Sequence, residues 1–292
     1  MPLNFSGRNV LITGGAMGIG KGLSERFAQE GANIALVDLL EQQGSLEAWA
    51  SELKETYGVK TWTFYADLTD ADGPEGVYEQ VTRHVGEVHT LVNNAGICWF
   101  GTFSEMPSDR MERMILLNCI AYAKLSRLFL PAMIDRDEGV ILNVSSVSAF
   151  QPVPKMAIYA ATKAFTQSLT EAVRCELPLG SKVTVSTLNP PFTRTSLIGD
   201  AGVPLDFVPL LTSFMDVSEV TRGGLLALKR GKVRYVPGLF NKFMYLYLVK
   251  FAPATVLGAL TWVLCNRLTD LVPDPVVKLY NIIRKQGGED YV

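Results

Sequence analysis

Short apolar runs of strand length alternate with segments of helical periodicity along most of the chain. The apolar runs lie at residues 9–15, 32–39, 60–68, 89–96, 139–146, 182–190 and 233–238. Apolar side chains at spacings of three and four, typical of amphipathic helices, occur at residues 24–32, 74–86, 108–133 and 159–177. Strands that are nearly all apolar suit a parallel sheet covered on both faces. The alternation therefore predicts an α/β fold with a doubly wound parallel sheet and right-handed crossovers.

The length and apolar content suit one large domain. Of the 292 residues, 48% are hydrophobic and 19% are charged, which is enough to build a sizeable core. The last fifty or so residues are richer in aromatic and apolar side chains, with interspersed prolines. We therefore expect residues 1–240 to form the domain. Residues 241–292 are expected to form an apolar helical extension that acts as a lid, an oligomer interface or a membrane-surface contact.

Charge and reactive side chains exclude several classes of function. A net charge of −2 disfavours nucleic-acid binding, which depends on clustered Lys and Arg. The four cysteines are scattered without a CxxC pair or a Cys/His cluster, so no metal site is expected and the thiols are typical of a reduced, intracellular protein. Two histidines and the lack of a GxSxG motif disfavour a hydrolase with a Ser–His–acid triad.

The sequence favours a cytoplasmic location. The polar start MPLNFSGRN predicts no signal peptide. The uncharged run at residues 251–266 is shorter than the roughly 20 apolar residues of a membrane span, and Pro253 and Gly258 interrupt it. Peripheral contact of residues 240–270 with a membrane surface stays open as an alternative.

A glycine-rich turn follows the first predicted strand. Residues 13–20 read TGGAMGIG, in which Gly14, Gly18 and Gly20 form a G-x-x-x-G-x-G pattern that leads into a helix. Glycine tolerates positive φ and lets the backbone approach a pyrophosphate at the helix N-terminus. Such turns also occur for steric reasons alone, but the position after the first strand favours a dinucleotide site.

An aspartate ends the second predicted strand. A carboxylate at Asp38 can accept hydrogen bonds from both hydroxyls of an adenosine ribose and repels a 2′-phosphate. No Arg or Lys follows at positions 39 and 40, and Met17 stands where a cation would favour that phosphate. The pattern predicts NAD rather than NADP, with an ordinary strand-end aspartate as the alternative. Asp67, which ends the third strand, is expected either to meet the adenine edge or to cap a helix.

Together these motifs resemble those of the short-chain dehydrogenase/reductase family, in its common single-domain branch. The resemblance covers roughly residues 5–240. It rests on TGGAMGIG, Asp38, Asp67, NNAG at 93–96, Asn118, NVSS at 143–146, YAATK at 159–163 and NPPFTRT at 189–195. It implies a Rossmann-type fold that uses NAD(P) to interconvert an alcohol and a carbonyl compound by hydride transfer. It also implies a homodimer or homotetramer joined through the long helices.

The resemblance implies four catalytic residues, which are Asn118, Ser146, Tyr159 and Lys163. Tyr159 matches the family's acid/base. A phenol with a pKa of about 10 is a poor base at neutral pH. Lys163, one helical turn away, supplies a cation that favours the phenolate. Ser146 would hold the substrate oxygen, with Ser145 as the competing assignment. Asn118 would sit at a helix distortion that holds a water connecting Lys163 to solvent; a polar surface residue is the alternative.

The cofactor would be bound by a larger set of residues. The expected residues are Gly14, Met17, Gly18, Ile19, Gly20, Asp38, Asp67, Leu68, Asn94, Ala95, Gly96, Tyr159, Lys163, Pro190, Thr193 and Thr195. The chain departs from the family at Pro191, where a glycine usually follows Pro190. Because proline fixes φ and lacks an N–H, this loop is expected to be shaped differently. Thr193 and Thr195 would still meet the carboxamide.

Three segments set the substrate in the family, namely residues 97–103, 147–158 and 195–214. Their neighbourhood is rich in apolar side chains, of which about half are expected to be simple packing: Trp99, Phe100, Phe103, Phe150, Val153, Met156, Phe192 and Leu197. Apart from Arg194, no arginine offers a clamp for an anionic substrate. We expect a lipophilic secondary alcohol or ketone, or an alcohol/aldehyde pair.

Two other functions remain open. One is an NADPH-dependent reductase of the ketoacyl type, acting on acyl-carrier or coenzyme A thioesters. The other is a non-catalytic dinucleotide-sensing regulator on the same fold, since a fold does not determine a function. A regulator of this kind would need the glycine turn but not the four catalytic side chains.

Overall fold

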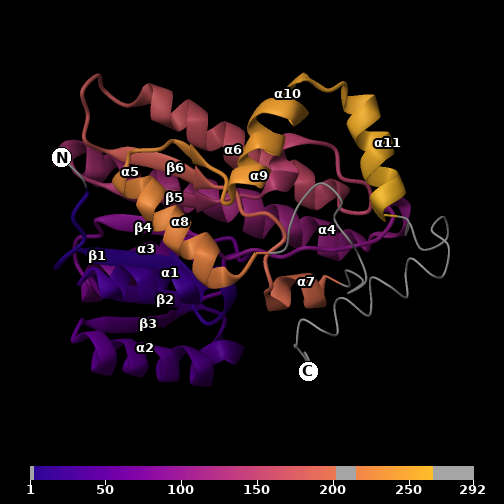
Figure 1. Ribbon diagram of the computed structural model, residues 1–292. Coiled ribbons are helices and arrows are strands. Elements are labelled where there is room, and N and C mark those ends of the chain that lie inside the picture. Colours follow the sequence, from indigo (N-terminus) through magenta and orange to yellow (C-terminus); the bar gives the residue numbers. More distant parts are fainter. Residues whose placement is uncertain (1–2, 202–214, 266–292) are drawn as a thin grey trace, which may run out of the picture.

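The computed structural model describes residues 3–201 and 215–265 and has the doubly wound architecture that the sequence predicts (Figure 1). A sheet of seven parallel strands has the order β3-β2-β1-β4-β5-β6-β7. The strands are β1 (Asn9–Thr13), β2 (Asn33–Asp38), β3 (Thr61–Tyr65), β4 (Thr90–Asn93), β5 (Val140–Val144), β6 (Thr184–Leu188) and β7 (Arg234–Tyr235).

Helices connect the strands, and each predicted helical segment overlaps one of them. The α-helices are α1 (Gly18–Gln29), α2 (Gln43–Tyr57), α3 (Gly73–His84), α4 (Ser108–Ile115), α5 (Tyr122–Asp135), α6 (Ala157–Glu176), α7 (Ser196–Asp200), α8 (Val217–Lys229), α9 (Leu239–Phe243), α10 (Val249–Phe251) and α11 (Ala254–Cys265). Two π-helices, η3 (Leu116–Ala121) and η5 (Met244–Leu248), and three 3₁₀-helices, η1 (Leu40–Gln42), η2 (Phe103–Glu105) and η4 (Val147–Phe150), complete the described elements. Helices α2 and α8 lie outside the segments that periodicity predicted.

The central strand β1 shows how both faces of the sheet are buried. Val10 and Ile12 belong to the core on the side of α1, α2 and α8, whereas Leu11 belongs to the core on the side of α3 and α5. Successive strand side chains point to opposite faces, so a strand covered on both sides has to be apolar throughout. This is why the predicted strands read as continuous apolar runs.

The longest helical stretch is Ser108–Asp135, formed by α4, η3 and α5. By length and composition alone it could cross a membrane. Its buried side chains, among them Leu125, Phe129 and Met133, pack in the core beside the sheet. The stretch is therefore a core helix of the α/β fold.

The order of the strands reverses between β1 and β4. From β1 the chain proceeds through β2 to β3 on one side, and then crosses to β4 and onward on the other. In open parallel sheets the loops at such a switch point diverge at the carboxyl ends of the strands and leave a crevice for ligands. The predicted site motifs follow β1, β2, β3, β4, β5 and β6, so the topology gathers them at this edge.

The described part of the C-terminal extension packs on the domain. Tyr245, Val249 and Leu257 share a buried cluster with Val147 and Val236. The outer side of the extension exposes Leu239, Phe240, Phe243, Tyr247, Phe251 and Val256. Figure 1 shows α9 and α10 at the end of the molecule opposite α2. Two parts of the expected elements lie outside the described residues. They are residues 266–292 of the extension and residues 202–214 of the third segment expected to set the substrate.

Candidate active site

A cavity of about 720 Å³ opens at the carboxyl ends of the strands. We call the part beside β1, β2 and β3 the glycine-turn end; its lining includes Gly14, Gly18, Asp38, Asp67 and Asn94. We call the part beyond β4, β5 and β6 the aromatic end; its lining includes Trp99, Met156, Phe192, Leu197 and Tyr245. Ser146, Tyr159 and Lys163 also line the cavity and lie where the two ends meet.

The glycine turn has a shape that other residues could not adopt. Gly14 and Gly18 have φ of +66° and +57°, in the left-handed region that favours glycine. A Cβ on Gly20 would lie 2.0 Å from the carbonyl oxygen of Gly14. Because α1 begins at Gly18, the free N–H groups of its first turn lie beside this turn. The turn and the helix N-terminus thus fit the pyrophosphate of a dinucleotide.

Asp38 and Asn94 hold this turn against the sheet. The Asp38 Oδ2 accepts a hydrogen bond from the Ala16 N–H at 2.9 Å, and its Oδ1 accepts one from the Leu39 N–H at 2.9 Å. The Asn94 Nδ2 donates to the carbonyl oxygens of Thr13 and Gly14 at 2.9 and 3.0 Å. Asp38 therefore lies in the cavity at the end of β2, where its carboxylate can meet a ribose.

Asp67 lines the cavity and is not a helix cap. The helix α3 begins at Gly73 with Asp72 in the N-cap position, so the capping alternative is wrong. The Asp67 Oδ1 accepts hydrogen bonds from the N–H and the hydroxyl of Thr69, and its Oδ2 pairs with the Arg113 guanidinium at 2.7 Å. Burial raises the pKa of Asp67, but these hydrogen bonds and the arginine charge outweigh it and hold the pKa below its usual value.

Tyr159 and Lys163 face the cavity together from α6. Tyr159 is 9% exposed, and Lys163 is 4% exposed. The Lys163 Nζ donates to the Val144 carbonyl oxygen at 2.9 Å and lies 5.6 Å from the centre of the Tyr159 ring. Burial lowers the pKa of Lys163 to about 8. The lysine therefore carries its charge at neutral pH, directly beside the phenol.

The Tyr159 phenol is protonated at neutral pH. Burial and the neighbouring Cys98 raise its pKa above the usual value, and a hydrogen bond with Ser146 offsets part of that shift. The Ser146 Oγ also accepts the Ser148 N–H at 3.2 Å. By contrast, the Ser145 hydroxyl donates to the Lys163 carbonyl oxygen at 2.8 Å. The geometry favours Ser146 over Ser145 as the partner of Tyr159 at a substrate oxygen.

Asn118 is completely buried, at 0% exposed, within the π-helix η3, so the surface alternative is wrong. Its Oδ1 accepts the Ile97 N–H at 3.0 Å, and its Nδ2 donates to the Ile97 carbonyl oxygen at 2.9 Å and to the Thr162 hydroxyl at 3.1 Å. The expected helix distortion is present. It lets one amide connect the loop after β4 to α6, next to Lys163. A water link from this site to solvent stays a prediction.

The remaining expected cofactor residues also reach the cavity, with the single exception of Gly20. The lining includes Met17, Ile19, Leu68, Ala95, Gly96, Pro190, Thr193 and Thr195. Gly20 is buried behind the turn, where its lack of a side chain is required. Pro191 lies in the lining too, and its carbonyl oxygen accepts the Thr193 hydroxyl at 2.9 Å. The unusual Pro190–Pro191 pair is thus compatible with both threonines facing the cavity.

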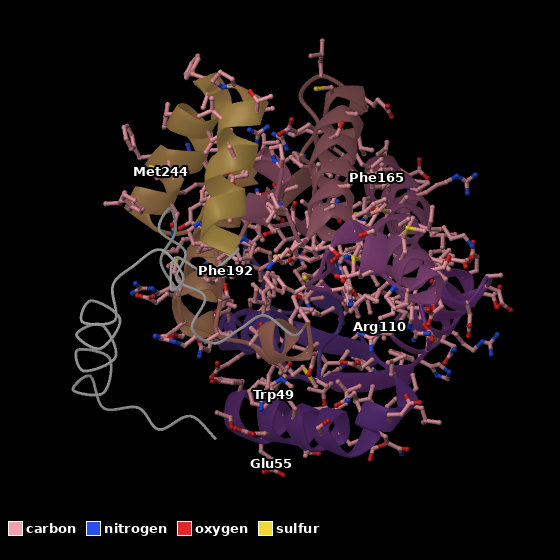
Figure 2. All side chains as sticks on the ribbon, turned by 90° about the vertical axis from the view of Figure 1, so that its right-hand side faces the viewer. Trp49, Glu55, Arg110, Phe165, Phe192 and Met244 are labelled. Carbon is pink, nitrogen blue, oxygen red and sulfur yellow. The ribbon has the colours of Figure 1, made fainter. Side chains whose placement is uncertain are left out.

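About half of the predicted apolar set lines the aromatic end. Trp99, Val153, Met156, Phe192 and Leu197 do so. Phe100 and Phe150 pack in neighbouring clusters, and Phe103 is 62% exposed. Figure 2 shows Phe192 in the middle of the molecule, between the extension that carries Met244 and the helix α2 that carries Trp49.

Three loops close around the aromatic end through backbone hydrogen bonds. The Phe100 N–H donates to the Ala201 carbonyl oxygen at 2.9 Å, and the Gly101 N–H donates to the Lys155 carbonyl oxygen at 2.9 Å. These bonds connect the loop after β4 both to the end of α7 and to the loop before α6. The described parts of the three segments predicted to set the substrate, residues 97–103, 147–158 and 195–201, are therefore connected to one another.

The motifs did not predict several of the lining residues. The helix α4 contributes Arg110, Arg113 and Met114, and the extension contributes Tyr245 and Thr261. Arg113 and Met114 lie about one turn before Asn118, so helical spacing from that residue would have indicated them. Arg194, the arginine named in the sequence analysis as able to clamp an anionic substrate, pairs with Asp216 at 2.9 Å. Figure 2 shows Arg110 on the far side of Phe192 from the extension.

Comparisons with known proteins agree with this geometry. The family model of short chain dehydrogenases matches residues 8–202. The very-long-chain 3-oxoacyl-CoA reductase of Bos taurus is 32% identical over 197 residues, which cover 65% of this chain and 61% of the bovine protein. The chain thus spans less than two thirds of the length of this curated relative.

Two solved structures are similar over most of both chains. A short-chain dehydrogenase from Sphingobium yanoikuyae in complex with NADPH has a TM-score of 0.75 and 32% identity, covering 82% of this chain and 91% of its own. The bulky-bulky ketone specific alcohol dehydrogenase from Comamonas testosteroni has a TM-score of 0.68 and 30% identity, covering 80% and 86%. Both are dehydrogenases of the same fold.

Proposed function

The chain belongs to the short-chain dehydrogenase family, and on this basis we propose that it is an NAD-dependent oxidoreductase that interconverts a lipophilic secondary alcohol and its ketone. One observation carries the proposal. A protonated Tyr159 phenol, hydrogen-bonded to Ser146 and lying beside the Lys163 ammonium, stands where the glycine-turn end meets the aromatic end. A non-catalytic dinucleotide sensor would have no use for this group of side chains.

The chain's own residues supply the proton that the substrate oxygen takes up in reduction and accept it in oxidation. A ketone oxygen placed between Ser146 and Tyr159 would accept hydrogen bonds from both hydroxyls, which position it and stabilise the negative charge that develops on it. When bound, the nicotinamide cofactor supplies or accepts the hydride. Tyr159 gives its proton to the resulting alkoxide oxygen in reduction and takes it back in oxidation. The Lys163 charge favours the phenolate that remains after reduction.

Support for NAD comes from the end of β2. The Asp38 carboxylate lines the cavity beside the glycine turn, where it would accept ribose hydroxyls and repel a 2′-phosphate. Met17, also in the lining, brings no positive charge to that side. The NADPH in the similar Sphingobium structure makes NADPH the natural competitor in any assay.

Support for a lipophilic ketone comes from the aromatic end. Its lining side chains are mostly apolar or aromatic, and apolar surface binds apolar substrates. The similarity to a dehydrogenase specific for ketones with two bulky substituents is consistent with this class.

A second candidate is an NADPH-dependent reductase of 3-oxoacyl thioesters. The name of the bovine relative favours it. The cavity also has Arg110 in its lining, a cation that could meet an anionic carrier group. This candidate uses the same Tyr159 chemistry and differs in cofactor and substrate.

A substrate and cofactor panel separates the two. Lipophilic ketones, polar sugars and 3-oxoacyl-CoA thioesters would each be incubated with NADH or NADPH, and cofactor absorbance would be followed. We expect the fastest turnover with a lipophilic ketone and NADH. Preference for polyols would contradict the substrate class, and preference for a thioester with NADPH would establish the second candidate.

The assembly and location stay proposals. We propose a homodimer or homotetramer through the long helices, since Ile115 on α4, Ile120 on η3 and Phe165 on α6 are exposed apolar side chains. Analytical ultracentrifugation of the wild type and of Phe165→Ser would test this, and a wild-type monomer would contradict it. We also propose a cytoplasmic protein; sedimentation with lipid vesicles would reveal any membrane contact of the exposed outer side of the extension.

A further inference from the structure

Two tyrosines of the π-helix η5 lie in opposite environments. Tyr245 is 4% exposed and lines the cavity, whereas Tyr247 is 54% exposed. The Tyr247 ring packs against Phe243 on the outer side of the extension, with ring centres 6.2 Å apart. The inner side of η5 therefore belongs to the cavity and the outer side does not.

Packing places Tyr245 beside the segment that follows Ser146 in the chain. Its ring lies 6.1 Å from the ring of Phe150, at the end of η4. The same buried cluster contains Val147, the residue that follows Ser146 in the chain. Tyr245 thus forms a wall of the cavity on the side of the loop that carries Ser146.

The helix α11 adds a second part of this wall. Thr261 is 6% exposed and lines the cavity, and its hydroxyl donates to the Leu257 carbonyl oxygen at 2.6 Å. Upstream on α11, the Cβ position of Gly258 lies 4.0 Å from Pro152. The helix α11 thus approaches the loop before α6 at Pro152, whose chain neighbours Gln151 and Val153 are also in the lining.

The chemistry of this wall is apolar. Among the residues that the structure describes, the charged residues of the cavity lining come from the domain and not from the extension: Asp38, Asp67, Asp109, Arg110, Arg113, Lys163 and Asp200. Residues 243–249 and 251–266 contain no charged residue. The donor of Thr261 is already used within its own helix. Contact with such a wall contributes most binding free energy for an apolar group, because water is displaced without leaving a polar partner unpaired.

We propose that Tyr245 and Thr261, with Val153, form a distal subsite that binds the hydrocarbon part of the substrate remote from its carbonyl. The substrate class assigned to this subsite rests on the proposed function. The subsite adds to that function the means by which the extension selects the substrate. The extension then acts from inside the cavity and determines how long or bulky a hydrocarbon group the site prefers.

The test compares Tyr245→Ala with the matched control Tyr247→Ala, which lies two residues further along η5 but on the outer side. Two measurements use a homologous series of 2-alkanones. One is kcat/KM with saturating NADH, and the other is calorimetric binding of each alkanone to the NADH-loaded protein. We expect Tyr245→Ala to lower both kcat/KM and affinity about tenfold for the longest alkanone and less than about twofold for the shortest. Tyr247→Ala should change neither, and Tyr245→Phe should keep the dependence on length.

The outcomes distinguish the subsite from the proposed function. If wild type binds alkanones with an affinity that grows with length, and only Tyr245→Ala loses that growth, the subsite stands even when no ketone is reduced. If ketones are reduced but Tyr245→Ala lowers kcat/KM and affinity by the same factor for every alkanone, the tyrosine only supports the Ser146 loop and the subsite is wrong. Equal effects of Tyr245→Ala and Tyr247→Ala, or no dependence of wild-type affinity on length, would also overturn it.

Discussion

The two ends of the cavity are built by different means. The glycine-turn end is held by backbone shape: positive φ at Gly14 and Gly18, no room for a side chain at Gly20, and hydrogen bonds that Asp38 accepts and Asn94 donates. The aromatic end is held by side-chain packing among loops and the extension. A demand on the backbone restricts a position to one or two residue types, whereas packing accepts many apolar side chains. The first end can therefore be read from the sequence almost residue by residue, whereas at the second the sequence indicates the apolar character but not which side chains reach the cavity.

A substitution at the junction of the two ends should have the largest effect on catalysis. Tyr159→Phe removes the proton donor but keeps the ring in its buried site. We expect kcat to fall about 10³-fold while the Kd for NADH and the binding of ketones stay near wild type, since neither end is altered. Steady-state kinetics and fluorescence titration with NADH check this. A variant that keeps substantial turnover would place the proton donor elsewhere.

Breaking only the glycine-turn end should remove cofactor binding. In Gly20→Ala the added methyl would lie against the Gly14 carbonyl oxygen, so the turn has to move. We expect the Kd for NADH to rise about a hundredfold. The control is Gly44→Ala in α2, where a Cβ meets nothing within 4 Å. A folded Gly20→Ala variant, verified by circular dichroism, that binds NADH as tightly as wild type would contradict the assigned site.

A smaller change at the same end should alter only the choice of cofactor. Asp38→Ala removes the carboxylate that would accept ribose hydroxyls and repel a 2′-phosphate. We expect the ratio of kcat/KM for NADH over NADPH to drop about tenfold, with the preference among ketones unchanged. Asp38→Asn serves as the comparison, because it retains an oxygen that can accept the Ala16 N–H. A wild-type enzyme that prefers NADPH would overturn the interpretation of Asp38.

The smallest expected effect concerns stability and pH. Burial lowers the pKa of Lys163 to about 8 in the folded protein, below its value of about 10.4 in an unfolded chain. Between these two values the unfolded state binds more protons, so this group makes the free energy of unfolding rise with pH, by about 1 kcal/mol per pH unit. Below pH 8 its contribution is constant.

Lys163→Met isolates this contribution. Denaturant unfolding of both proteins from pH 7 to pH 10 should show the stability of wild type increasing relative to the variant only above about pH 8. A difference between the two proteins that is independent of pH would show that Lys163 has an ordinary pKa. Activity plays no part in this measurement, so it tests the burial of the lysine alone.

The same contrast explains what the sequence could predict. The alternation of apolar runs predicted the sheet, because each parallel strand has to be apolar on both faces. The motifs predicted Asn118, Ser146, Tyr159 and Lys163, and the structure brings them together. Whether Asp67 caps a helix depended on where α3 begins, and Asp72 rather than Asp67 precedes it.

The aromatic end shows where prediction from sequence stops. Phe103 and Trp99 are both aromatic and four residues apart, yet only Trp99 reaches the cavity. Tyr245 and Tyr247 are two residues apart in a uniformly apolar stretch, and only the first does so. Their orientation depends on how the extension docks on the domain and on the π-helix that carries them. Neither feature has a local sequence pattern.

The central claim is that the two ends meet at a site of hydride transfer. The most direct measurement is the mass of the alcohol formed from a lipophilic ketone and NADH that carries deuterium at C4 of the nicotinamide, with each C4 epimer used in turn. We predict that one epimer transfers its deuterium to the carbinol carbon, and that Tyr159→Phe forms almost no alcohol from either. An alcohol that contains no deuterium from either epimer, or tight NADH binding without any alcohol across the ketone series, would contradict the account.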